Sequence, residues 1–149
     1  MNMQNKIPQT NLKISKLEAL RECKVVFLES LISAGFPSSA ENFVESSLDL
    51  NDLVIKHQSS TYFIRVIGDS MEGAGIKTND ILIVDRSLSA ANNKVVVVRI
   101  NDEFLVKKLV IKEDKIFLFA ENNKYKPIEI TSEMDFEVWG VVTFVIHQV

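Results

Sequence analysis

The chain has 149 residues, 46% of them hydrophobic, and a formal net charge of −3 with acidic and basic residues intermixed. This length fits one moderate domain with a short appendage, and the hydrophobic share is enough for a real core. Because no basic block stands out, the composition argues against direct sequence-specific DNA binding.

Cysteine content and hydropathy indicate a cytoplasmic protein. The single cysteine, Cys23, excludes an internal disulfide and fits a reducing compartment, and we expect it to have a packing or surface role. No apolar run is long enough to span a bilayer. Residues 1–16 are polar and contain no apolar signal core, so export is not expected.

The N-terminal part is expected to form a short, partly helical arm. Residues 1–13 are polar and read as a disordered lead. From Ser15 onward apolar residues recur at roughly helical spacing, and Ser15 with Glu18 resembles a capping box. The predicted helix ends at Ala34-Gly35, because Gly35 suits a C-terminal cap.

Two further helical pieces are expected after this arm. The segment 38–47 opens with a capping sequence and is read as helical. Residues 49–53 resemble a turn that leads to another short helical piece near 54–56.

From about residue 38 onward, the pattern indicates a compact, mainly antiparallel β domain. Apolar, β-branched runs predict strands at 61–66, 81–84, 95–100, 103–111, 115–120 and 136–147. Asn101-Asp102 is a two-residue polar break, so the strands on either side of it form a hairpin. The last strand is long, and Gly140 marks a bulge or bend in it.

A candidate nucleophile lies in the motif Gly68-Asp69-Ser70-Met71. Glycine lets the backbone turn sharply near the serine, and the amides exposed in such a turn can stabilise an oxyanion. A serine hydroxyl is a poor nucleophile until a base removes its proton. The alternative is an ordinary loop serine, and four common residues alone do not exclude it.

A candidate general base, Lys107, lies in an apolar predicted strand beside a second lysine, Lys108. Lys107 shares a face with Leu105 and Leu109, but the face of Lys108 is also apolar, so alternation does not identify the buried lysine. A lysine that acts as a base near pH 7 needs a pKa roughly three units below about 10.4, which requires near-complete burial. The alternative is that both lysines reach solvent from an edge strand.

Other titratable residues give weaker signals. His57 and His147 have no partner spacing typical of a catalytic triad or a metal site, and Asp69 is read as a turn former. With one cysteine and two separated histidines, no metal site and no cofactor are predicted.

Several segments together resemble the UmuD proteins, which belong to the LexA-like family of self-cleaving serine peptidases. These segments are 68–71, 80–85, 103–109 and 138–142, with further similarity at 34–38 and 62–64. The resemblance spans about residues 30–149 and is strong because the motifs occur in the right order. It implies a compact β peptidase domain at 35–149 and an N-terminal arm at 1–34 that self-cleavage removes.

The resemblance also implies the roles of the site residues. In the family pattern Ser70 falls on the nucleophile and Lys107, rather than Lys108, on the general base. The backbone amides of Asp69 and Ser70 would then hold the oxyanion. This is the reading of a Ser-Lys dyad serine endopeptidase that cleaves its own chain.

Ala34-Gly35 falls on the bond that the family cleaves. UmuD proteins often carry Cys-Gly there, whereas LexA repressors carry Ala-Gly, so the departure stays within the wider family. Small residues at this bond can enter a narrow cleft, and a helix end at the same place stays an alternative. The first 30 residues match the family least well.

The implied biology is the SOS response to DNA damage. A RecA filament on single-stranded DNA would stimulate the cleavage, and the shortened product would join a UmuC-like Y-family polymerase in error-prone translesion synthesis and SOS mutagenesis. Family members imply a homodimer, and cleavage in cis or in trans stays open.

Other functions remain alternatives. A LexA-type or phage-type repressor shares the catalytic core but needs a DNA-binding head, for which the stretch before the cleaved bond is short and shows no basic recognition helix. A signal peptidase uses a similar pair but needs a membrane anchor. A non-enzymatic polymerase-binding module would retain Ser70 and Lys107 only as relics.

Overall fold

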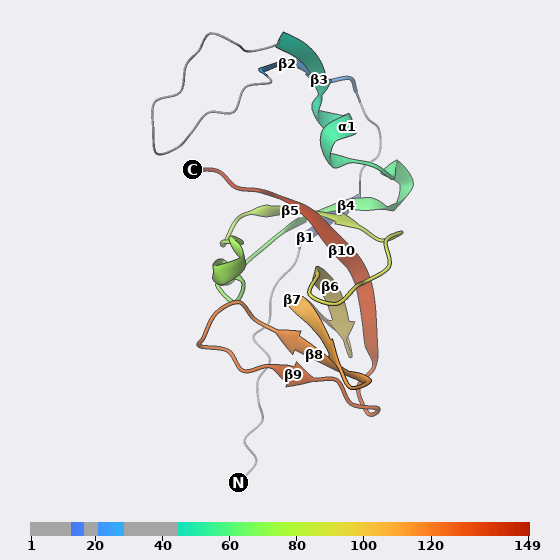
Figure 1. Ribbon diagram of the computed structural model, residues 1–149. Coiled ribbons are helices and arrows are strands. Elements are labelled where there is room, and N and C mark those ends of the chain that lie inside the picture. Colours follow the sequence, from blue (N-terminus) through green and yellow to red (C-terminus); the bar gives the residue numbers. More distant parts are fainter. Residues whose placement is uncertain (1–12, 17–20, 29–44) are drawn as a thin grey trace. The chain divides into compact units, whose positions relative to one another are not determined.

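The computed structural model describes residues 13–16, 21–28 and 45–149 (Figure 1). The chain divides into two compact units, one made of residues up to 17 together with 57–149, and the other of residues 18–56. Each unit has its own sheet, one with eight strands and one with two. The predicted division at residue 34, which rests on self-cleavage, stays a prediction.

The larger unit is built on an antiparallel sheet of eight strands, in the order β1-β4-β5-β10-β6-β7-β8-β9. The strands are β1 (Lys13–Lys16), β4 (Thr61–Arg65), β5 (Ile81–Asp85), β6 (Val95–Ile100), β7 (Glu103–Lys112), β8 (Lys115–Phe119), β9 (Ile128–Glu129) and β10 (Phe136–Ile146). Two short 3-10 turns belong to the same unit, η1 (Gln58–Ser60) and η2 (Glu72–Ala74). This architecture confirms the prediction of a mainly β, LexA/UmuD-like fold.

The six strands predicted from β-branched and aromatic runs are confirmed to within one or two residues. β6 and β7 form the expected hairpin, with Ile100 opposite Glu103 across the two-residue turn. Asn101 adopts a positive φ of 52°, which asparagine tolerates in tight turns. β9 was not predicted, because a strand of two residues has no periodic pattern.

β10 is one long strand that pairs with β6 along its first half and with β5 along its second half (Figure 1). Its register shifts between Val138 and Gly140 and again between Val142 and Phe144. A Cβ atom at Gly140 would lie 2.6 Å from Val84 Cγ1, so glycine is needed where the strand passes over β5. The predicted bulge at Gly140 is therefore confirmed.

The core of the larger unit consists of two clusters. The first contains Ile64, Val66, Met71, Ile76, Leu82, Val84, Val97 and Val106, and the second contains Val96, Val98, Ile100, Leu105, Leu109, Leu118 and Val141. Neighbouring residues of β6 and β7 alternate between the clusters, as the period of two in a strand requires. Apolar residues on both faces explain why these strands read as continuous hydrophobic runs.

The smaller unit corrects the helical predictions for the N-terminal part. Lys24–Leu28 is strand β2 and pairs with β3 (Glu45–Asp49). Ser15 lies in strand β1 of the larger unit. The helix predicted from Ser15 is therefore wrong wherever the structure describes it. β-Branched and aromatic residues in 25–27 favour a strand once a partner is available, and a short apolar run fits either period.

The remaining part of that helix, including its predicted end at Ala34-Gly35, lies outside the described residues. The predicted helical segment 38–47 is also wrong at its described end, because residues 45–47 belong to β3. The short helical piece expected near 54–56 occurs earlier, as α1 (Leu50–Val54). Asp49 is its N-cap, with a side-chain oxygen that accepts from the Asn51 amide at 2.8 Å.

Candidate active site

Ser70 lies in a tight turn between β4 and β5. Met71, which follows it, is buried in the first core cluster and fixes the turn to the body of the sheet. The turn continues into η2, where the Glu72 amide donates to the Asp69 carbonyl at 3.2 Å and the Ala74 amide to the Met71 carbonyl at 3.0 Å. The serine itself is half-buried and so can meet a substrate chain.

The amides of this turn are the predicted oxyanion donors. Within the described part of the chain, the Ser70 amide donates no hydrogen bond, which leaves it available for a developing negative charge. The Asp69 carbonyl is held by Asn122 Nδ2 at 2.9 Å as well as by Glu72. The oxyanion role of Asp69 and Ser70 stays a prediction.

Lys107 is the buried lysine of the pair. Its residue is 6% exposed, and it lies opposite Val96 in the β6–β7 ladder. Burial lowers the pKa of the Lys107 amine, and the nearby Asp69 carboxylate opposes this only in part. Among the described residues, no hydrogen bond or ion pair reaches its Nζ atom, whereas Lys108 Nζ forms an ion pair with Glu121.

The loop 121–125 connects the lysine to the serine turn. β8 ends at Phe119, opposite Lys108, so the chain leaves the sheet next to Lys107. The Gly73 amide donates to the Glu121 carbonyl at 2.7 Å, and a Cβ atom at Gly73 would lie 2.5 Å from that oxygen. The loop can approach η2 this closely only because residue 73 is glycine.

Tyr125 in this loop contacts both sides of the site. Its hydroxyl donates to Asp69 Oδ1, and the Lys107 Nζ atom lies 5.3 Å from the centre of its ring. The hydrogen bond from Tyr125 lowers the pKa of Asp69 and raises the pKa of the tyrosine. Sequence reasoning missed Tyr125, because nothing in its local pattern indicates a contact across more than 50 positions.

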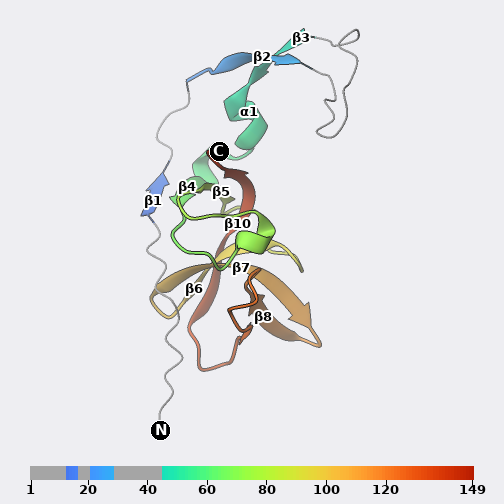
Figure 2. The ribbon, with the colours of Figure 1, turned by 90° about the vertical axis from the view of Figure 1, so that its left-hand side faces the viewer.

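The structure therefore places the Ser70 turn and Lys107 in one neighbourhood, joined through Asp69 and Tyr125. Figure 2 shows the green turn with η2 near β7. No hydrogen bond joins Ser70 to Lys107 in the described structure, and a missing bond without substrate does not exclude a catalytic role. Ala34 and Gly35, the predicted cleaved residues, lie outside the described residues.

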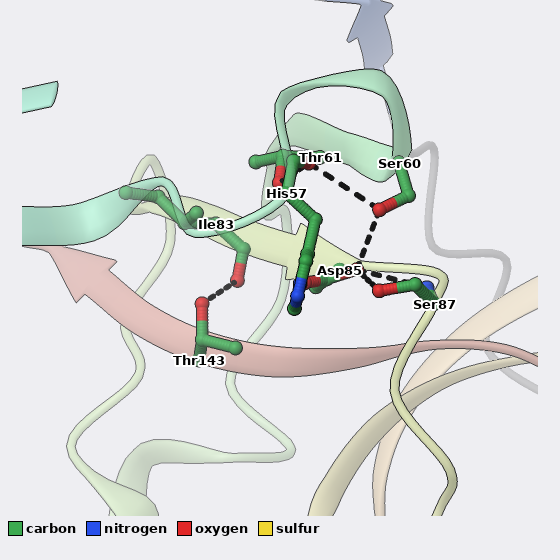
Figure 3. A network of polar contacts seen from close by, with 7 residues as sticks. All are labelled: His57, Ser60, Thr61, Ile83, Asp85, Ser87 and Thr143. Carbon is green, nitrogen blue, oxygen red and sulfur yellow. Dashed lines mark hydrogen bonds and ion pairs between the residues drawn. The ribbon is translucent and has the colours of Figure 1, made fainter. Parts of the chain in front are cut away.

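The two histidines belong to polar pairs elsewhere in the unit. His57 Nδ1 lies 2.5 Å from Asp85 Oδ2, and Asp85 also accepts from the hydroxyls of Ser60 and Ser87 at 2.9 and 2.7 Å (Figure 3). Burial alone would raise the pKa of Asp85, but the hydrogen bonds from Ser87, His57 and Ser60 outweigh it and lower the pKa to about 2.

His147 makes a similar pair at the other end of β5. Its Nδ1 atom lies 2.6 Å from Asp80 Oδ1, and the Lys77 amide donates to Asp80 Oδ2 at 2.7 Å. Burial would raise the pKa of Asp80, but these two hydrogen bonds give a net lowering. Neither histidine contacts Ser70 or Lys107, so both pairs stabilise the fold around β5.

No group of three or more His, Cys, Asp or Glu residues within residues 13–16, 21–28 and 45–149 is arranged to hold a metal ion. None of the helices found in these same ranges is long and apolar enough to cross a membrane.

Known proteins resemble this chain over most of its length. The Peptidase S24-like family model matches residues 26–143. Protein MucA of Salmonella typhimurium is 40% identical over 84% of this chain and 86% of that protein, and Protein SamA of Salmonella typhimurium is 37% identical over 77% and 79%. The LexA repressor of Shewanella piezotolerans is 39% identical over 66% of this chain and 48% of that protein.

The family match covers both the turn with Ser70 and the strand with Lys107. Together with the eight-stranded antiparallel sheet, it confirms the resemblance drawn from the sequence. The chain belongs to the Peptidase S24-like family, the UmuD/LexA-like group of self-cleaving serine peptidases.

Proposed function

We propose that the protein is a UmuD-like self-cleaving serine endopeptidase in which Ser70 is the nucleophile and Lys107 the general base. The observation that supports this most is the burial of Lys107 without an ion-pair partner in the described structure, next to the turn that presents Ser70. Burial lowers the pKa of this amine, so it loses its proton more readily than an exposed lysine, and in its neutral form it can accept the serine proton.

The proposed reaction has two steps. The Lys107 amine takes the Ser70 hydroxyl proton while Ser70 Oγ attacks the Ala34 carbonyl carbon. The Ala34–Gly35 bond then breaks, and the lysine proton passes to the departing Gly35 amine. In the second step Lys107 removes a proton from water, the water oxygen attacks the ester carbon, and Ser70 regains its proton.

The substrate of this reaction is the protein's own arm. A tethered segment has a high effective concentration at the site, so no extended binding pocket is needed for affinity. The Ser70 amide, which has no acceptor in the described part of the chain, supports an oxyanion-stabilising role for the turn.

For regulation and partners, the proposal relies on the likeness to UmuD-like proteins. In this proposal a RecA filament on single-stranded DNA favours the docked arm. The cleaved chain, 35–149, then acts as a homodimer and as an accessory subunit of a UmuC-like translesion polymerase in the cytoplasm. The match covers 86% of MucA but only 48% of the LexA repressor, which favours this role over a repressor.

Incubation of the purified full chain, followed by mass spectrometry, tests the activity. One fragment should end at Ala34 and the other should begin at Gly35, and the Ser70→Ala chain should stay intact under the same conditions. RecA filaments should speed the reaction of the wild-type chain only. An intact wild-type chain with and without filaments would favour a non-enzymatic binding module instead.

A further inference from the structure

Asp69 precedes the serine, and its carboxylate lies close enough to Lys107 to act on the charge of the lysine amine. Its carboxylate acts on the Lys107 amine in the direction that restores the protonated form. If this carboxylate formed an ion pair with the amine, Lys107 would stay charged at neutral pH and would no longer be a base. Something must therefore occupy the carboxylate.

Tyr125 occupies it. The tyrosine hydroxyl donates to Asp69 Oδ1, and Lys124 Nζ lies 3.8 Å from Asp69 Oδ2, so both carboxylate oxygens have partners in the loop. Asn122 holds the carbonyl of the same residue at 2.9 Å. The loop 121–125 thus fixes the residue before the nucleophile through three side chains.

The same tyrosine covers the lysine amine. The ring centre lies 5.3 Å from Lys107 Nζ, so Tyr125 lies beside the amine as well as beside Asp69. Of the other charged groups nearby, Lys108 pairs with Glu121, and Glu72 raises the pKa of Tyr125 but is not among the causes of the pKa shift of Lys107.

We propose that Tyr125 is a positioning residue of the peptidase, which holds the Asp69 carboxylate away from Lys107 through its hydrogen bond to Asp69 Oδ1. This inference rests on the proposed Ser-Lys mechanism and adds a residue to it. Among the described residues, Tyr125 contacts Asp69, the neighbour of the proposed nucleophile, and lies beside the proposed base Lys107, so it would act through these two residues.

The pH dependence of self-cleavage separates this role from a merely structural one. Tyr125→Phe keeps the ring and removes the hydrogen bond to Asp69. The freed carboxylate then pairs with Lys107, and the midpoint of the rising pH–rate profile should move up by about one unit, with a rate at neutral pH about tenfold lower. A lower rate with an unchanged midpoint would overturn the proposal.

Two further variants give the test its controls. Tyr125→Phe combined with Asp69→Asn should return the midpoint to the wild-type value or below it, because no carboxylate is left to pair with the lysine. Tyr62→Phe removes the hydroxyl of the other tyrosine, which packs against Trp139 at a centroid distance of 5.0 Å, and should leave the midpoint unchanged. Failure of the double variant to restore the midpoint would contradict the role of Asp69.

A second measurement keeps the inference testable if the wild-type chain does not cleave. Lysine side-chain NMR of the full Ser70→Ala chain reports the titration of Lys107 directly, with the signal assigned by loss in a Lys107→Arg sample. Adding Tyr125→Phe should raise the titration midpoint by a similar amount. An unchanged midpoint would exclude the proposal, whereas absent cleavage with a shifted midpoint would exclude only the proposed activity.

Discussion

Two buried ionisable groups of this molecule, Asp85 and Lys107, have opposite surroundings. Asp85 has a side chain that is 5% exposed and accepts hydrogen bonds from His57, Ser60 and Ser87, so it stays ionised with a pKa of about 2. Lys107 is equally buried, but no ion pair or hydrogen bond reaches its amine in the described structure. Its pKa is lowered, which favours the neutral amine. Burial with hydrogen-bond partners stabilises a charge, whereas burial without them favours the neutral form of an amine.

The largest effect is expected from removing the base. Lys107→Ala should lower the self-cleavage rate by about 10³-fold, because it removes the proposed acceptor of the Ser70 proton. The matched control is Lys108→Ala, which removes the neighbouring lysine and its ion pair with Glu121. Mass spectrometry of timed samples measures both rates. A larger loss of rate in Lys108→Ala than in Lys107→Ala would assign the base to Lys108.

Removing the carboxylate of Asp85 should lower the stability of the fold and leave the self-cleavage chemistry intact. Asp85→Ala leaves the amide and hydroxyl of Ser87 without this acceptor, and the Ser60 hydroxyl with only the His57 carbonyl at 3.3 Å, and should destabilise the fold by about 3 kcal/mol. Urea denaturation of the chain in a Ser70→Ala background measures this loss. The exposed residue Glu133 is the control, since Glu133→Ala should change stability by less than about 0.5 kcal/mol.

Acid should weaken the same network. The folded-state pKa of Asp85, about 2, lies below its ordinary value of 3.8, so the folded state binds its proton less readily than the unfolded state. Its contribution, about 2 kcal/mol, is present above pH 4 and is lost as the pH falls through about 2. Urea denaturation at both pH values should show this loss in the wild-type chain and a smaller loss in Asp85→Asn. Equal losses would assign the acid sensitivity to other carboxylates.

The smallest effect is expected from one donor of the network. Ser60→Ala removes a single hydrogen bond of 2.9 Å to Asp85, while Ser87 and His57 still hold the carboxylate. The stability should fall by about 1 kcal/mol, as judged from the shift of the urea midpoint. A loss as large as that of Asp85→Ala would mean that the network acts as a single unit.

The fold of the larger unit could be predicted because its strands are rich in β-branched and other apolar residues, a composition that favours strands over helices and loops. The strand β2 could not be predicted, because Val25 and Leu28 have a helical spacing while Val25 and Phe27 alternate as in a strand. The choice depends on pairing with β3, which a local pattern does not show. Local pattern thus predicts an element only where it excludes the alternatives.

The candidate site shows the same limit. The two lysines of β7 have equally apolar neighbours, and their difference arises from the loop after β8, where Glu121 pairs with Lys108 and Tyr125 covers Lys107. Only the resemblance to a family favoured Lys107 before the structure was known. Contacts between distant segments, which a local pattern does not encode, decide which lysine is buried.

The first strand of the large sheet has a consequence of its own. β1 borders β4 through four residue pairs, from Lys13 opposite Arg65 to Lys16 opposite Tyr62, and it precedes the proposed cut in sequence. If Ala34–Gly35 is cleaved, β1 is no longer covalently linked to the rest of the sheet. The fraction of β1 that stays bound to β4 then depends on the concentrations of the two fragments. So short a strand would dissociate on dilution, and the vacated border of β4 would make the cleaved chain a different partner from the intact one.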